Sequence, residues 1–207
     1  MSGSGSGLKR IVMHWTAGTY TASGLDRKHY HFLVDGKGEV VPGIHPPEHN
    51  IDVSKGNYAA HTLNCNTGAI GVAIAAMGNA SEHPFVSGVY PITAKQVDVF
   101  VKVVANLCKA YGIEVTRKTV LTHAEVEPTL GIKQRGKWDI TWLPGMEKPG
   151  DPVKIGDHLR ERILAEQGRS PFVAAPETLA VEKSKGFLAA LLAAIGGILV
   201  WLTKGRR

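Results

Sequence analysis

The segment 69–77, with the sequence AIGVAIAAM, constrains the fold most because it is apolar on both of its faces. A strand that is exposed on one side alternates apolar and polar residues, whereas a strand covered on both sides shows an unbroken apolar run. The segment therefore predicts a central strand buried within its sheet. Helices must supply the cover, so we expect an α/β architecture.

The clearest helix is predicted to begin after Thr93, because Thr93 and Gln96 form the pattern of a capping box. Apolar residues then recur at helical spacing as far as Tyr111, and Gly112 supplies a stop signal. A second helix is predicted between residues 151 and 167.

Further strands are predicted at residues 9–14, 29–34 and 39–41, and the last two are separated by a glycine-containing loop typical of a hairpin. Strands and helices thus alternate along the chain. We predict a central mixed β-sheet flanked by helices, followed by a C-terminal hydrophobic helix.

The 207 residues divide by composition into four parts. Residues 1–8 form a Gly/Ser-rich leader without the apolar core of a signal peptide. Residues 9–167 contain the predicted domain, and residues 168–186 have the Pro, Ala, Ser and charged residues of a linker. Residues 187–203 contain no charge, and basic residues flank them on both sides.

This apolar tail is predicted to associate with a membrane. As a helix, its first sixteen residues span about 24 Å, somewhat less than a hydrocarbon core of roughly 30 Å. A helix buried in the domain or in an oligomer interface is the alternative. The net charge is +6, and residues 168–207 hold six basic against two acidic residues, so the excess flanks the tail. No nucleic-acid-binding face is indicated.

Two histidines and one aspartate stand out as candidate metal ligands. His14 follows the apolar run 11–13, His123 follows the apolar pair 120–121, and Asp139 ends the sequence Lys137-Trp138-Asp139. Two imidazoles and one carboxylate leave the fourth position of zinc open, as in catalytic rather than structural sites. Each histidine alone is more often a hydrogen-bonded structural residue.

The motifs around these residues resemble the type 2 N-acetylmuramoyl-L-alanine amidases, which include the T7-type phage lysozymes and the peptidoglycan recognition proteins. Five blocks in the family order, between residues 9 and 143, carry the resemblance: HWT at 14–16, YHFLVDGKGEV at 30–40, AH at 60–61, NTGAIGV at 66–72, and THAEV at 122–126 with KWD at 137–139. It implies a zinc site formed by His14, His123 and Asp139.

The resemblance also implies catalytic roles for Tyr30 and Lys137. Zinc activates a water and polarises the amide carbonyl, and the Lys137 ammonium would stabilise the oxyanion. Tyr30 would orient the water or share in proton transfer, unless it is a core residue. Only fifteen residues separate His14 from Tyr30, where typical relatives insert a full helix. This spacing indicates either a compact subgroup or a shifted match at Tyr30.

Glu125 and four further residues complete the predicted site. If Glu125 lies two residues beyond His123 on one strand, both side chains face the same side. Glu125 would then either support an imidazole or act as a general base. The predicted substrate-binding residues are Trp15, Thr16, His61 and Asn66.

The function implied by the resemblance is hydrolysis of the amide between N-acetylmuramic acid and L-alanine in peptidoglycan. The tail suggests a phage or prophage endolysin that is membrane-associated, with its catalytic domain initially in the cytoplasm and acting on the cell wall. The alternatives are a non-catalytic peptidoglycan-binding module and a cytoplasmic muropeptide-recycling amidase.

Overall fold

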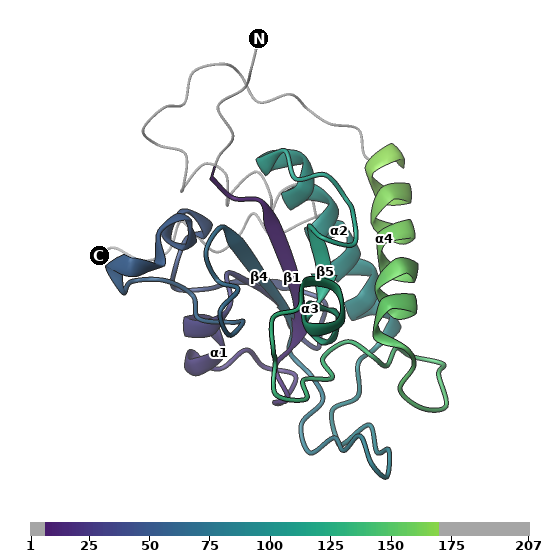
Figure 1. Cartoon of the computed structure of the whole chain (residues 1–207). Helices are drawn as coiled ribbons and strands as arrows, with labels where there is room; N and C mark the ends of the chain where they lie inside the picture. The colour runs from purple at the N-terminus through teal and green to yellow at the C-terminus, as the bar shows by residue number, and fades with distance from the viewer. Residues whose placement is uncertain (1–6, 170–207) are drawn as a thin grey trace, which may run out of the picture. The chain divides into compact units, whose positions relative to one another are not determined.

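The computed structural model describes residues 7–169, and a five-stranded sheet runs through this part of the chain (Figure 1). The strand order is β3-β2-β4-β1-β5. The strands are β1 (Arg10–Trp15), β2 (Phe32–Val34), β3 (Val40–Pro42), β4 (Ala69–Ile74) and β5 (Val120–Thr122). Neighbouring strands pair in parallel except β2 and β3, which pair antiparallel. The predicted mixed α/β sheet is confirmed.

Four α-helices and two short 3-10 helices connect the strands of the described chain. They are α1 (Gly24–His29), η1 (Pro47–Ile51), η2 (Val53–Lys55), α2 (Ala94–Tyr111), α3 (His123–Leu130) and α4 (Pro152–Arg169). Helices α2 and α4 pack side by side next to the sheet (Figure 1). The capping box of Thr93 and Gln96 begins α2, and Gly112 ends it with φ 64° in the left-handed region, both as predicted.

The side chains on the two faces of β4 differ in size, and the face with small side chains leaves room for the candidate site. All six residues of β4 are buried, as expected for a central strand. On one face, Ile70, Val72 and Ile74 pair in register with large apolar residues of β1. On the other face β4 has only Ala69, Gly71 and Ala73, and Ala73 pairs with His14.

A small apolar cluster on the His14 face fixes α3 to the sheet. Val12, Cys65, Ala69 and Val126 form this cluster, and two partly buried residues, Leu130 and Ile132, pack against it. Since Val12 belongs to β1 and Val126 to α3, the cluster positions α3 next to the strand that carries His14.

The predicted strands have other bounds in the structure: those at 9–14 and 39–41 are shifted by one residue, and the one at 69–77 ends at Ile74. The strand expected at 29–34 begins only at Phe32, because a capping box of Ser23 and Asp26 starts α1, which continues to His29. The strand expected to deliver His123 ends at Thr122. Thr122 caps α3 in a second capping box with Glu125, so His123 is the first residue of a helix.

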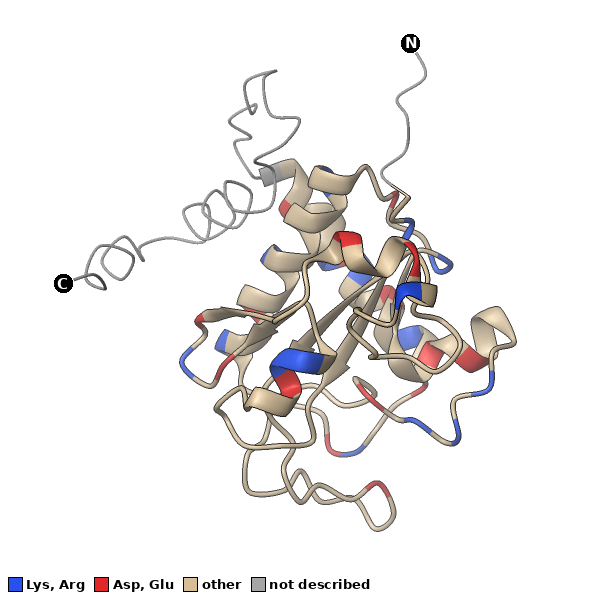
Figure 2. Cartoon of the chain, turned by 90° about the vertical axis from the view of Figure 1, so that its left-hand side faces the viewer, with Lys and Arg blue, Asp and Glu red and all other residues tan. Residues whose placement is uncertain are grey.

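No helix within residues 7–169 is long and apolar enough to span a bilayer. The predicted tail at 187–203 lies outside the described residues, as does most of the linker predicted at 168–186. The first two linker residues, 168–169, belong to α4. Acidic and basic residues are interspersed along the elements of the described domain (Figure 2).

A buried ion pair attaches α4 beneath the start of α3. Both guanidinium nitrogens of Arg160 donate to Glu125, at 2.8 Å to Oε1 and 3.1 Å to Oε2, and Arg160 Nη1 also donates to the carbonyl of Val120 at 2.8 Å. Gly156 allows this approach, because a Cβ at that position would collide with the Glu125 carboxylate. Arg160 thus connects α4 to the end of β5 and to the first turn of α3.

We predict that Arg160→Leu lowers the free energy of unfolding by about 3–5 kcal/mol, because it leaves the Glu125 carboxylate buried without its partner. Urea denaturation measures this loss. Arg162→Ala is the matched control: its partner Asp98 is exposed, so a loss of at most about 1 kcal/mol is expected. Equal losses in the two variants would contradict a structural role for the buried pair.

Candidate metal centre

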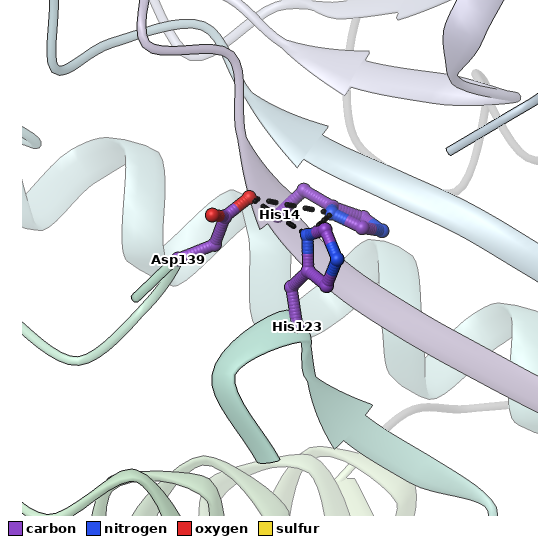
Figure 3. Close-up of side chains that lie close together, drawn as sticks. All are labelled: His14, His123 and Asp139. Atoms are coloured by element: carbon purple, nitrogen blue, oxygen red, sulfur yellow. Dashed lines mark hydrogen bonds and ion pairs between the residues drawn. The ribbon is translucent and has the colours of Figure 1, made fainter. Parts of the chain in front are cut away.

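His14, His123 and Asp139 come from three separate elements and meet at one point (Figure 3). His14 lies on β1, and His123 begins α3 directly after β5. Parallel pairing of Met13 with Thr122 brings these two histidines side by side. Asp139 follows the loop after α3, and its carbonyl accepts a hydrogen bond from the N–H of Ala124 at 3.4 Å. All three side chains are buried.

The distances between the three potential ligand atoms match a tetrahedral zinc site. The two Nδ1 atoms are 3.1 Å apart, and Asp139 Oδ2 lies 3.2 Å from His123 Nδ1 and 3.4 Å from His14 Nδ1. Zinc bonds of about 2.0–2.1 Å in a tetrahedral arrangement place neighbouring ligand atoms about 3.3 Å apart. The described side chains therefore form three corners of a tetrahedron of the right size.

A chain of hydrogen bonds fixes the tautomer of His14. His61 Nε2 faces the carbonyl of Ala69 at 3.3 Å, so this nitrogen carries the proton and His61 Nδ1 accepts. His14 Nε2 lies 3.2 Å from His61 Nδ1 and 3.4 Å from Thr62 Oγ1, which itself lies 2.7 Å from His61 Nδ1, so a proton on His14 Nε2 has two acceptors. The lone pair of His14 Nδ1 is left facing His123 and Asp139.

Charge states at the centre also suit a cation. Burial lowers the pKa of His14 to about 4, so its imidazole is neutral at neutral pH. Burial alone would raise the pKa of Asp139, but the imidazoles of His123 and His14 beside its carboxylate outweigh burial and keep this pKa below its ordinary value. A neutral imidazole at His14 and an ionised carboxylate at Asp139 are donors that zinc binds.

Tyr30 and Lys137 lie near this centre. The ring of Tyr30 is 5.1 Å from that of His14. Burial raises the pKa of the Tyr30 phenol, and the negative charge of Asp139 raises it further. The phenol therefore keeps its proton and can donate a hydrogen bond. Lys137 is exposed, and its charge is one of the smaller causes that lower the pKa of His14. The short spacing between His14 and Tyr30 thus still brings Tyr30 to the site.

The prediction that Glu125 faces the metal with His123 is wrong. The two residues lie on the first turn of α3 and not on a strand, so a separation of two positions no longer places them on one face. Glu125 accepts from the N–H of Thr122 at 2.8 Å and pairs with Arg160. Its carboxylate supports α3 and is fully buried away from solvent.

The four predicted substrate-binding residues all have partners inside the protein, and their role toward the substrate stays a prediction. Trp15 is 4% exposed and packs edge-on against Trp138, with ring centroids 4.6 Å apart. Thr16 Oγ1 accepts from the N–H groups of Gly18 and Ala76. His61 is 7% exposed behind His14, and Asn66 Oδ1 accepts from the backbone N–H of His61 and Thr62.

Gln134 is a site residue that sequence reasoning missed. Its Oε1 lies 2.9 Å from Nε2 of His123, and its side chain is buried although the neighbouring loop residues are exposed. A single glutamine between Lys133 and Arg135 gives no periodic signal that could have marked it.

Buried histidines continue beyond the centre. The ring of His61 packs against His31, 5.7 Å away, and a Cβ on Gly71 would lie only 2.5 Å from Cγ of His61. His31 Nδ1 accepts from the N–H of Gly71 at 2.9 Å, and its Nε2 donates to Asn50 Oδ1 at 3.0 Å. These bonds require a neutral His31, and burial lowers its pKa to about 4.

Comparison with known proteins identifies a related family. Residues 4–145 match the family described as N-acetylmuramoyl-L-alanine amidase (Amidase_2). The matched range contains all three candidate ligands. No match to the chain was found among curated proteins.

We predict that acid destabilises the metal-free protein partly through His31. Its pKa in the folded protein lies below the ordinary 6.5, so the unfolded chain binds more protons between pH 6.5 and 4. Stability is therefore fully present above pH 6.5 and falls as the pH is lowered through this window, by about 3 kcal/mol for one such group.

Denaturation at several pH values in the presence of chelator tests this effect. His31→Gln should reduce the slope of stability against pH between 4 and 6.5, whereas His158→Gln, at an exposed position of α4, should leave it unchanged. The same slope in His31→Gln and the unaltered protein would show that His31 does not titrate as described.

Proposed function

The chain belongs to the N-acetylmuramoyl-L-alanine amidase family and is a hydrolase of that class, and from this premise we propose that it is a zinc enzyme. In this proposal, His14, His123 and Asp139 hold the ion, and the enzyme cleaves the amide between the lactyl group of N-acetylmuramic acid and L-alanine of peptidoglycan.

One observation carries the zinc assignment. Three ligand atoms, two imidazole nitrogens and one carboxylate oxygen, lie 3.1–3.4 Å from one another at one buried point. Outer hydrogen bonds occupy the Nε2 atoms of both histidines, so neither Nδ1 needs to hold a proton. A cation bound at this point would offset the charge of the buried Asp139 carboxylate.

The protein groups around the centre have complementary tasks. Zinc, when bound, supplies Lewis acidity and makes water a nucleophile at neutral pH. The Tyr30 phenol, which keeps its proton, donates a hydrogen bond toward the reacting oxygen atoms. The Lys137 ammonium stabilises the negative charge that develops on the scissile carbonyl oxygen. Trp15 and Trp138 pack together beside two ligands and limit their movement.

The biological role proposed here is degradation of the bacterial cell wall, as in lysis. The composition of residues 187–203 supports association with a membrane through that segment. This part of the proposal depends on the sequence alone.

We predict that the full chain releases new L-alanine amino termini from peptidoglycan, that a chelator abolishes this release and that zinc restores it. Asp139→Asn should reduce the rate by about 100-fold or more, since a metal contributes several kcal/mol to catalysis. Asp98→Asn, at an exposed carboxylate on α2, is the control and should retain activity.

Three outcomes would contradict this proposal. Release of reducing sugars in place of amino termini would indicate a glycosidase. Activity that survives the chelator would exclude the metal. Binding to peptidoglycan without cleavage would indicate a non-catalytic module.

We further predict that the full chain, expressed in bacteria, remains in the membrane fraction after carbonate extraction. A variant with Leu192→Glu and Leu199→Glu should move to the supernatant, because each charge in an apolar segment costs roughly 3 kcal/mol of insertion free energy. Recovery of the unaltered chain in the supernatant would end the membrane proposal and leave the amidase proposal unaffected.

A further inference from the structure

We propose that Gln134 is a positioning residue that sets the tautomer and orientation of His123 and so determines the affinity of the centre for its metal. This inference rests on the proposed zinc function. Its basis is a set of four hydrogen bonds made by one glutamine, at 2.8–3.2 Å.

Gln134 is buried in a loop whose other polar residues face solvent. The side chain is 3% exposed, while Lys133 and Arg135 on either side are exposed. Its backbone N–H donates to Glu127 Oε2 of α3 at 2.8 Å, which fixes the loop to the helix that begins with His123. The conformation of the loop therefore directs the Gln134 side chain into the protein interior.

The orientation of the Gln134 amide follows from its neighbours. Its Nε2 lies 2.9 Å from the carbonyl oxygen of Leu63 and 3.2 Å from that of Ile132. Both are acceptors only, so the amide nitrogen must be on this side and the oxygen must face His123. His123 Nε2 lies 2.9 Å from that oxygen and must carry the proton.

This proton position directs the other nitrogen of His123 to the metal. With the proton on Nε2, Nδ1 offers its lone pair to the point shared with His14 and Asp139. With the proton on Nδ1, the ring would donate to Asp139 Oδ2, 3.2 Å away, and could not bind a cation. Gln134 favours the first form because the second would leave its own oxygen unpaired.

Gln134 also connects the supports of the two histidine ligands. Leu63 follows His61 and Thr62 in the chain. The Nδ1 atom of His61 lies within hydrogen-bond distance of Nε2 of His14. The bond from Gln134 to the Leu63 carbonyl thus joins the segment behind His14 to the loop behind His123. The Gln134 amide therefore fixes the position of its own loop relative to the segment that carries His61.

Two near-isosteric variants separate positioning from general structural support. Gln134→Met removes the acceptor and the donors. Gln134→Glu retains an acceptor for His123 but directs its second oxygen at the two carbonyl oxygens. We expect Gln134→Met to weaken zinc binding by about 10- to 100-fold and Gln134→Glu to bind within a few fold of the unaltered chain. Competition with a chromophoric zinc chelator measures both, with Lys133→Met as the exposed control.

Unfolding of the metal-free variants provides the second measurement. Gln134→Glu should be at least as destabilised as Gln134→Met, because its carboxylate faces two carbonyl oxygens. The order of zinc affinity is then opposite to the order of stability. Zinc affinities that simply follow the stabilities, or an unchanged affinity in Gln134→Met, would overturn the proposal.

Failure of the proposed function gives a different result. If the unaltered chain binds no zinc, the metal centre and the role of Gln134 both fall. If the unaltered chain binds zinc and cleaves peptidoglycan while Gln134→Met does so equally well, only the role of Gln134 is rejected.

Discussion

Parallel pairing of β1 with β4 on one side and β5 on the other is the constraint on which the centre depends. Register with β5 sets His14 beside the residue that follows Thr122. Register with β4 pairs His14 with the small residue Ala73, and Gly71 two positions earlier leaves room for the His61 ring. A shift of one residue in either pairing would turn His14 to the opposite face, where large apolar side chains fill the space.

Helices α3 and α4 hold the His123 side of the centre in place. Thr122 caps α3, and Glu125 connects the same turn to Arg160 of α4, so His123 projects from a fixed helix start. The apolar cluster around Val126 holds the rest of α3 against β1. Outer hydrogen bonds from His61 and Gln134 then set the direction of each imidazole. Such outer partners are needed for a metal site to be preorganised.

Sequence reasoning predicted the sheet and the ligands but not the local geometry. The apolar run of β4 and the capping box at Thr93 are periodic or local signals, and both predictions are confirmed. The same capping pattern occurs at Thr122 and Glu125, yet the apolar residues before it suggested a longer strand. His61 and Trp15 were expected at the substrate from the resemblance, and the burial of both side chains could not be predicted from their motifs. Gln134 could not be found because its partners are distant in the chain and only the fold joins them.

The centre unites one of the first residues of the described domain with one near its end, since His14 lies on the first strand and Asp139 follows the last strand and α3. A chain still emerging from the ribosome, or one cut short before residue 139, has both imidazoles without the carboxylate. Neither β5 nor the loop after α3 can be omitted from a working centre. Partial translation products would therefore lack a complete set of candidate ligands, and the centre could assemble only once synthesis has passed residue 139.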